Sequence, residues 1–244
     1  MLSEDEKAKF ASDGFLVFDG LLSEERVSYY VGVFDELVAN GRELSEEAPH
    51  WSLEYDDRGN PIAGVLHKVQ GVCQVDSRVL ELASEPDILG RVAGFVGEDI
   101  DLFGTKFFPK LPNGGTSTHW HQDNFYFGTE TDRIISCAIY MEPADRDNGC
   151  LQVVPASHRS GIVEHTRNPN GHGSWTPVDD ALATDVVCSA GTVVLFSANL
   201  LHGAADNESD RSSYRTAWHY IPGSLSLEGF PRGGYGDRFT VQGV

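Results

Sequence analysis

The chain has 244 residues, long enough for a substantial hydrophobic core, and we expect residues 1–244 to form a single domain. Its 18 lysines and arginines stand against 37 aspartates and glutamates, which gives a formal charge of −19. A charge of this sign repels phosphate backbones and anionic membrane surfaces, so neither nucleic acid nor a membrane is an expected partner.

No apolar run approaches the ~20 residues that a membrane span requires, and residues 1–6 are acidic. The four cysteines, Cys73, Cys137, Cys150 and Cys188, form no C-x-x-C pair, so we interpret them as buried thiols. These features predict a soluble, intracellular protein, with the cytoplasm as the expected compartment. They predict no particular oligomeric state.

The first part of the chain favours helices. Ser3 and Glu6 have the spacing of a capping box that opens a short helix ending near Gly14, and residues 15–18 then have the pattern of a strand. A longer amphipathic helix is predicted to begin at Ser23 and to end at an Asn-Gly pair. Its apolar side chains recur at helical spacing and are expected to form core.

The next segment is rich in turn formers. Residues 42–63 are acidic and aromatic, and residues 56–61 mark a loop or hairpin tip, so this segment is a candidate lid. A further helix is predicted from a Ser84 cap to about Gly97. We therefore expect residues 1–98 to form a helical and strand support for the remainder.

Beyond residue 98 the pattern changes to short apolar runs separated by turns. Seven runs are predicted strands: 100–109, 116–121, 134–141, 150–154, 186–188, 192–196 and 214–221. Strands of this number and length favour a sandwich or a closed double sheet, with residues 99–222 as its core. Residues 160–180 interrupt the series and are a candidate lid. The glycine-rich tail, 231–244, is expected on the surface.

His121 and Asp123 lie two residues apart at the end of a predicted strand, where side chains at this spacing leave the same face. An imidazole nitrogen beside a carboxylate oxygen supplies two of the three donors of a 2-His-1-carboxylate site. This donor set suits non-haem Fe(II) and leaves three coordination positions open. His202, which follows the apolar run 192–196, is the candidate third ligand. A closed structural zinc site commonly includes cysteine, and no cysteine lies near His121 in the sequence.

Four segments occur in a fixed order that is typical of one enzyme family. They are His67-Lys68-Val69, His121-Gln122-Asp123, Asn148 to Leu151 with Val154 to Gly161, and His202-Gly203 with Asn207, Ser209 to Arg211 and Arg215. In these segments the chain resembles the phytanoyl-CoA dioxygenase (PhyH) family of Fe(II)/2-oxoglutarate-dependent oxygenases, and in particular its domain-containing proteins. The resemblance implies a mostly β double-stranded β-helix, a jelly-roll barrel with N-terminal helices packed on one sheet.

The resemblance also implies a reaction. His121, Asp123 and His202 hold Fe(II) as the catalytic centre, 2-oxoglutarate chelates the iron, and O2 takes the remaining position. The products are succinate, CO2 and an oxidised small-molecule substrate. Halogenating relatives replace the carboxylate ligand with a small residue, so the presence of Asp123 favours hydroxylation.

A cation is needed for the distal carboxylate of 2-oxoglutarate. In the family an arginine follows the distal histidine by eleven residues, a position that Ser213 occupies in this chain. Arg215 resembles the family's Arg-x-Ala at the start of the last strand, and Arg211 is the alternative. Period-2 counting places Arg215 and His219 on one face of that strand.

Some further positions match the family, and others depart from it. Lys68 matches a family lysine that assists with the co-substrate carboxylate, and Tyr126 is expected to face the co-substrate. Ala138 and Ala204 replace a tryptophan and a serine that usually touch it. Two alternatives therefore stay open: a jelly-roll protein that binds metal and 2-oxoglutarate without turnover, and a cupin-like metalloenzyme that does not use 2-oxoglutarate and is indifferent to Arg215→Ala.

Overall fold

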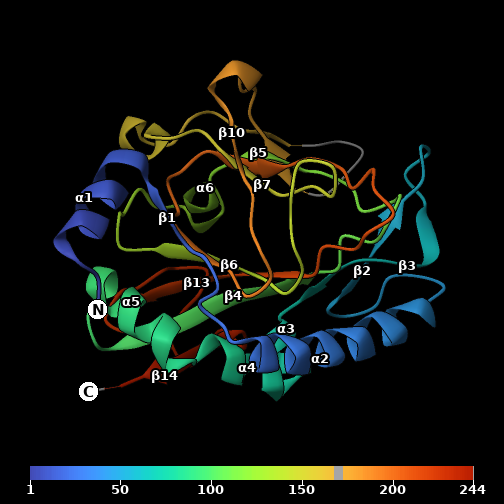
Figure 1. Ribbon diagram of the computed structural model, residues 1–244, viewed down its shortest axis with the longest axis horizontal. Helices are drawn as coiled ribbons and strands as arrows, with labels where there is room; N and C mark the ends of the chain where they lie inside the picture. Colours follow the sequence, from blue (N-terminus) through green and yellow to red (C-terminus); the bar gives the residue numbers. More distant parts are fainter. Residues whose placement is uncertain (168–172, 244) are drawn as a thin grey trace.

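The computed structural model of the protein describes residues 1–167 and 173–243 (Figure 1). Their strands form two facing antiparallel sheets and one short hairpin. The larger sheet has the order β1 (Phe15–Phe18), β11 (Val193–Ser197), β6 (Ile135–Tyr140), β13 (Arg215–Pro222), β4 (Ile100–Phe108), β3 (Pro61–Gln70) and β2 (Trp51–Tyr55), and β14 (Arg238–Gln242) pairs with β4. The fold is a jelly roll, as predicted.

The smaller sheet covers one face of the larger one, at the top of Figure 1. Its order is β10 (Thr184–Val186), β7 (Leu151–Val153), β12 (His202–Ala204) and β5 (Thr118–His121). The hairpin pairs β8 (Thr166–Arg167) with β9 (Ser174–Trp175), and short 3-10 turns span Ser157–Ser160 and Asp180–Leu182. The candidate lid 160–180 includes residues 168–172, which lie outside the described residues.

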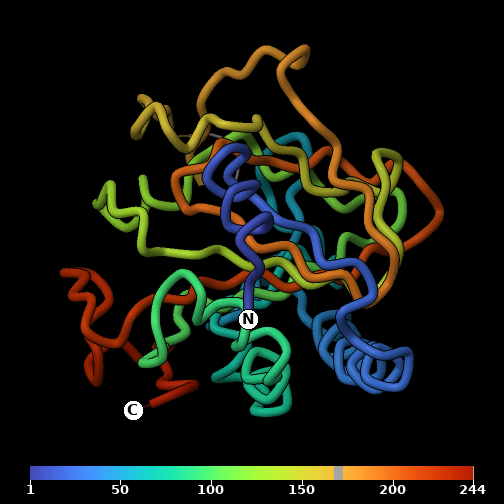
Figure 2. Tube along the Cα trace, turned by 60° about the vertical axis from the view of Figure 1, so that its left-hand side comes forward, coloured from blue at the N-terminus to red at the C-terminus, as the bar shows by residue number. Residues whose placement is uncertain are grey.

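Helices cover the other face of the larger sheet in both views of the chain (Figures 1 and 2). They are α2 (Glu24–Arg42), α3 (Val72–Val75), α4 (Ser77–Ala83) and α5 (Pro86–Val96), while α1 (Glu4–Asp13) lies beside β1. Phe34 of α2 stacks on Phe107 of β4, with ring centroids 4.3 Å apart. No helix in the described ranges is apolar over a length that could span a bilayer.

A cluster of apolar side chains, separate from the core under the helices, fills one end of the space between the two sheets. It includes Tyr140 and Val194 from the larger sheet and Leu151 and Val153 from the smaller one. The four cysteines are buried and free, as predicted. The other end of this space is open and holds the candidate site.

The two helices predicted near the N-terminus are confirmed, but the second runs through its Asn40-Gly41 pair to Arg42. Ser3 and Glu6 form the capping box, and Gly14 ends α1 with φ of 87°, a left-handed conformation that glycine adopts without a steric penalty. The Ser84 cap is wrong. The N-cap of α5 is Glu85, with Pro86 in the first turn, and the Ser84 hydroxyl donates instead to the Leu80 carbonyl at 2.7 Å.

The seven predicted strands correspond to β4, β5, β6, β7, β10, β11 and β13, with ends that differ by a few residues. The hairpin tip predicted at 56–61 is confirmed. Residues 51–55 and 61–70 form its two strands, and the Asp56 carboxylate closes the tip by accepting from Asn60 N at 2.8 Å. The tail is not only a surface segment. Its Arg238 is buried in β14 and donates to Asp101 at 2.9 Å.

Candidate metal centre

The three candidate ligands come from two strands and one short helix. His121 ends β5 and His202 begins β12, and the two residues are register partners in the smaller sheet. Asp123 is the first residue of α6 (Asp123–Phe127), so the prediction that it lies on the same strand face as His121 is wrong. Buried Gln122 makes the turn between them, and its side-chain amide donates to the Gly161 and Asn199 carbonyls.

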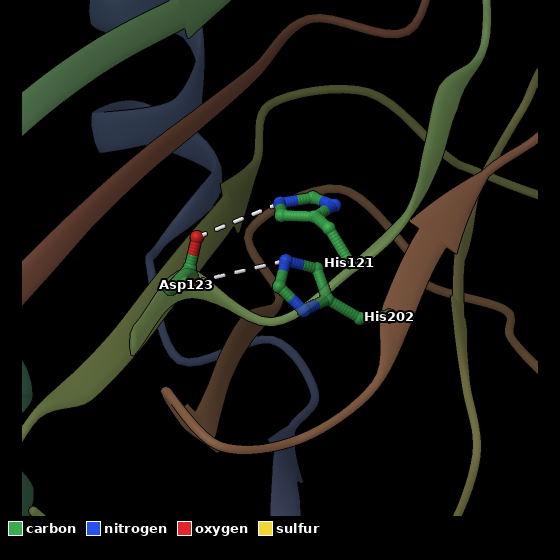
Figure 3. Close-up of side chains that lie close together, drawn as sticks. All are labelled: His121, Asp123 and His202. Carbon is green, nitrogen blue, oxygen red and sulfur yellow. Dashed lines mark ion pairs between the residues drawn. The ribbon is translucent and has the colours of Figure 1, made fainter. Parts of the chain in front are cut away.

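The three side chains converge on one point (Figure 3). His121 Nε2 lies 3.6 Å from Asp123 Oδ1, and His202 Nε2 lies 3.7 Å from Asp123 Oδ2. One donor atom from each residue lies within 4.8 Å of the others. Two imidazole nitrogens and one carboxylate oxygen at this spacing match the facial site that suits non-haem Fe(II).

Backbone carbonyls orient both imidazole rings. His121 Nδ1 is 2.7 Å from the His119 carbonyl, and His202 Nδ1 is 3.0 Å from the Leu200 carbonyl. Because a carbonyl oxygen can only accept, each Nδ1 carries the proton. Each Nε2 lone pair is therefore directed at the centre, the arrangement that a metal-binding histidine requires.

A chain of hydrogen bonds orients the Asp123 carboxylate. The Ser136 hydroxyl, on β6, donates to Asp123 Oδ2 at 2.6 Å and lies 3.0 Å from Nδ1 of His219. The ammonium group of Lys106 lies 3.3 Å from Nε2 of His219. Lys106 can thus donate to His219, His219 to Ser136, and Ser136 to the carboxylate.

Burial and local charge set the protonation of the donors. Burial, with a smaller contribution from His121, lowers the pKa of His202 to about 4. Burial also lowers the pKa of His219 to about 3. For Asp123 burial acts to raise the pKa, and the neighbouring histidines outweigh it and hold that pKa well below its usual range. At neutral pH His202 is therefore neutral and Asp123 ionised, the forms that bind a metal cation.

A cavity of about 350 Å³ lies beside the three ligands. Arg215, Ala217 and His219 alternate along the face of β13 that lines it. Ala217 is opposite Ala138 of β6, and both small side chains line the cavity. The two departures from the family, Ala138 and Ala204, thus both lie on the cavity lining.

The cations proposed for the co-substrate differ in position. Arg215 is buried, lines the cavity and donates to the Gly149 carbonyl. Arg211 lies outside the cavity, where its exposed guanidinium pairs with Asp145 at 2.8 Å. Lys68 lines the cavity, and burial, with a smaller effect of Lys106, lowers its pKa to about 8.

Tyr126 lies at the edge of the cavity. Its ring meets the His121 ring edge-on, with centroids 5.7 Å apart, and its hydroxyl accepts from Ser174 N at 2.7 Å. Sequence patterns did not place Ser136 or His219 in the site, and they suggested for Lys106 only a position near the cavity mouth. The one signal available was the shared face of Arg215 and His219, because the hydrogen bonds of Ser136 and Lys106 span strands that are distant in sequence.

The family model of phytanoyl-CoA dioxygenase (PhyH) matches residues 10–217. The peroxisomal phytanoyl-CoA dioxygenase of Bos taurus is 28% identical over 236 residues, which cover 90% of this chain and 68% of that protein. The ectoine dioxygenase of Nocardia farcinica is 24% identical over 223 residues, covering 83% and 72% of the two chains.

A crystal structure of EctD from S. alaskensis with 2-oxoglutarate and 5-hydroxyectoine has the same fold. Its TM-score is 0.74 at 19% identity, and the alignment covers 93% of this chain and 78% of that one. Because the family model spans most of the sequence, the chain belongs to the phytanoyl-CoA dioxygenase (PhyH) family of iron- and 2-oxoglutarate-dependent dioxygenases, as its motifs predicted.

Proposed function

We propose that this dioxygenase hydroxylates a small molecule at an Fe(II) centre held by His121, Asp123 and His202. The observation that carries the proposal is the approach of their three donor atoms to within 4.8 Å of one another. Three protein ligands on one side of the ion leave positions for a bidentate co-substrate and O2. The group includes neither a cysteine nor a fourth protein ligand in the described ranges, which favours iron over a closed zinc site.

Bound iron and 2-oxoglutarate supply the activation of O2, in which 2-oxoglutarate is oxidatively decarboxylated to succinate and CO2 and one oxygen atom is transferred to the substrate. The residues of this chain bind and orient the reactants. Arg215 would hold the distal carboxylate through two parallel hydrogen bonds, and Lys68 would add a second cation. Arg215 forms no ion pair with the described residues, so an incoming carboxylate would provide the anionic partner that a buried guanidinium requires. Tyr126 would border the co-substrate beside His121.

The size of the cavity and the names of the relatives both support a small substrate. A volume of about 350 Å³, part of which 2-oxoglutarate must occupy, is at the lower end for ligand pockets. Relatives include an ectoine dioxygenase and the L-proline trans-4-hydroxylase of Streptomyces griseoviridis, the latter 24% identical over 229 residues. Asp123 keeps the carboxylate ligand that hydroxylation requires in this family.

The proposal is tested by incubating the purified protein with Fe(II), 2-oxoglutarate and O2 and measuring succinate. We expect succinate from the wild type and none above background from His121→Ala. His50→Ala is the matched control, because exposed His50 lies outside the group of ligands and should keep wild-type turnover. Binding of Fe(II) and 2-oxoglutarate without succinate would identify a binding protein. Metal-dependent activity that ignores 2-oxoglutarate would identify a different kind of metalloenzyme.

A further inference from the structure

Lys106 is a lysine of the cavity that the proposed co-substrate leaves without an anionic partner. Burial lowers its pKa, and an anion beside it would favour its charged form. It lies on β4 between Gln70 of β3 and Ala217 of β13, and its side chain lines the cavity. Its hydrogen bond to His219 joins it to a neutral partner. Once Arg215 and Lys68 are assigned to 2-oxoglutarate, Lys106 still has no counterion in the part of the chain that the structure describes.

No carboxylate of the described residues is free to fill that role. Asp123 is the one acidic side chain that lines the cavity among the described residues, and its charge is committed to the metal. Asp237 is also near, but its carboxylate accepts from the backbone N and the hydroxyl of Thr105, at 2.6 and 2.7 Å. Neither acid is within ion-pair distance of Lys106. A partly buried ammonium group beside a metal centre is costly to keep charged unless an anion joins it.

The side chains near Lys106 indicate what kind of molecule carries this anion. Phe127, Phe230 and Tyr235 line the same part of the cavity, with ring centroids 5.4 Å apart for the first pair and 5.0 Å for the second. Phe127 also meets the His219 ring at 4.8 Å. The ammonium group and these rings, which we call the acid subsite (Lys106, Phe127, Phe230 and Tyr235), combine one positive charge with an apolar wall.

The backbone is built to hold this arrangement. Gly104 has φ of 63°, and a Cβ atom there would lie 3.1 Å from Cδ2 of His219. Its lack of a side chain lets the His219 ring pack against β4, where Nε2 meets Lys106. The ammonium group is thereby fixed two side chains away from the metal-ligating Asp123.

We propose that the acid subsite binds the substrate, and that the substrate is a small carboxylic acid whose carboxylate pairs with Lys106 and whose apolar body lies against the three aromatic rings. This inference rests on the proposed function and names its substrate class. The short path from Lys106 to Asp123 through His219 and Ser136 means that the hydroxylated carbon lies close to the carboxyl group. A large polyanion does not fit, since Lys106 is the one lysine or arginine of the described cavity lining that is left for the substrate, and the cavity has a volume of about 350 Å³.

The test uses matched pairs of compounds. Small carboxylic acids with cyclic or branched apolar bodies, each beside its own primary amide, are added to the protein with Fe(II), 2-oxoglutarate and O2, and the stimulation of succinate release is measured. We expect acids to stimulate and their amides to be at least tenfold weaker in kcat/KM. Lys106→Met should lower kcat/KM for the stimulating acids at least tenfold, and Lys106→Arg, which keeps the charge, should retain the preference for acids.

Two controls separate the possible failures. Lys7→Met removes an exposed lysine of α1 that pairs with Glu4, and it should change nothing. Succinate release, basal or stimulated by any compound, reports the proposed function itself, so the absence of both contradicts that function. If basal release is present, three results would overturn the subsite proposal. Amides could stimulate as strongly as acids, or the preference for acids could survive in Lys106→Met. The third result is a panel in which no acid stimulates succinate release.

Discussion

His202 lies directly opposite His121 in the antiparallel pairing of β12 with β5, and their ring centroids are 4.2 Å apart. The two histidines are 81 residues apart in the sequence. The hydrogen-bonded ladder of the smaller sheet, rather than a flexible loop, therefore sets the distance between the proposed iron ligands. Sites built on strands hold their geometry more precisely than sites built on loops.

We expect Ser136→Ala to weaken Fe(II) binding by about tenfold or more, because it removes the hydrogen bond that orients the Asp123 carboxylate. Isothermal titration with Fe(II) under anaerobic conditions measures the effect. Ser213→Ala is the matched control, since Ser213 is also buried and its hydroxyl has no hydrogen-bond partner among the described residues. Equal affinities in the two variants would contradict a role for Ser136 in positioning the ligand.

Arg215→Gln should raise the KM for 2-oxoglutarate at least about tenfold, because losing one partner of a buried charged pair is costly. Arg211→Gln breaks only an exposed pair with Asp145 and should leave that KM within about twofold of the wild type. Succinate release at varied 2-oxoglutarate concentration compares them. The assignment of Arg215 fails if Arg211→Gln has the larger effect.

The pH dependence of 2-oxoglutarate binding should depend on Lys68. Burial lowers its pKa to about 8, so the free side chain is charged below pH 8 and loses its proton above it. Binding of an anion favours the charged form, so affinity should be level below pH 8 and should fall as pH rises beyond it. Anaerobic titrations at several pH values should give a smaller fall for Lys68→Met. Identical profiles would remove Lys68 from the co-substrate site.

Mutations on the face of α2 that packs on the larger sheet should lower the free energy of unfolding more than mutations on its exposed face. Phe34 is fully buried against Phe107, and its replacement by alanine should lower the free energy of unfolding by about 3–5 kcal/mol. Tyr29 lies on the same helix but is 47% exposed, so Tyr29→Ala should cost less than about 1 kcal/mol. Urea unfolding followed by circular dichroism compares the two. Similar losses of unfolding free energy would contradict the expectation that the buried face of α2 contributes most to stability.

The family and the jelly-roll fold could be predicted from sequence because both depend on local patterns. Short apolar runs between turns located the strands, and motifs in order located the family. The chain turn between His121 and Asp123 could not be predicted in this way. It depends on the buried Gln122 side chain, whose partners at Gly161 and Asn199 are distant in sequence.

Long-range partners also explain the remaining differences. The tail joins the larger sheet because Arg238 pairs with Asp101, and composition alone suggested a surface segment. Lys106 and His219 meet because β4 and β13 are neighbours, with a register shift between Ala217 and His219 that simple alternation does not include. Such contacts become visible only when the strand order is known.

In the proposed site, His121, Asp123 and His202 bind one iron ion and leave room for 2-oxoglutarate on it. Anaerobic addition of 2-oxoglutarate to the Fe(II)-loaded protein, followed by visible absorption, tests this most directly, because direct chelation produces a charge-transfer band. We predict a saturable band in the wild type with one equivalent of Fe(II), and its loss in His202→Ala. A wild type without the band, or a band that persists in His202→Ala, would contradict the account.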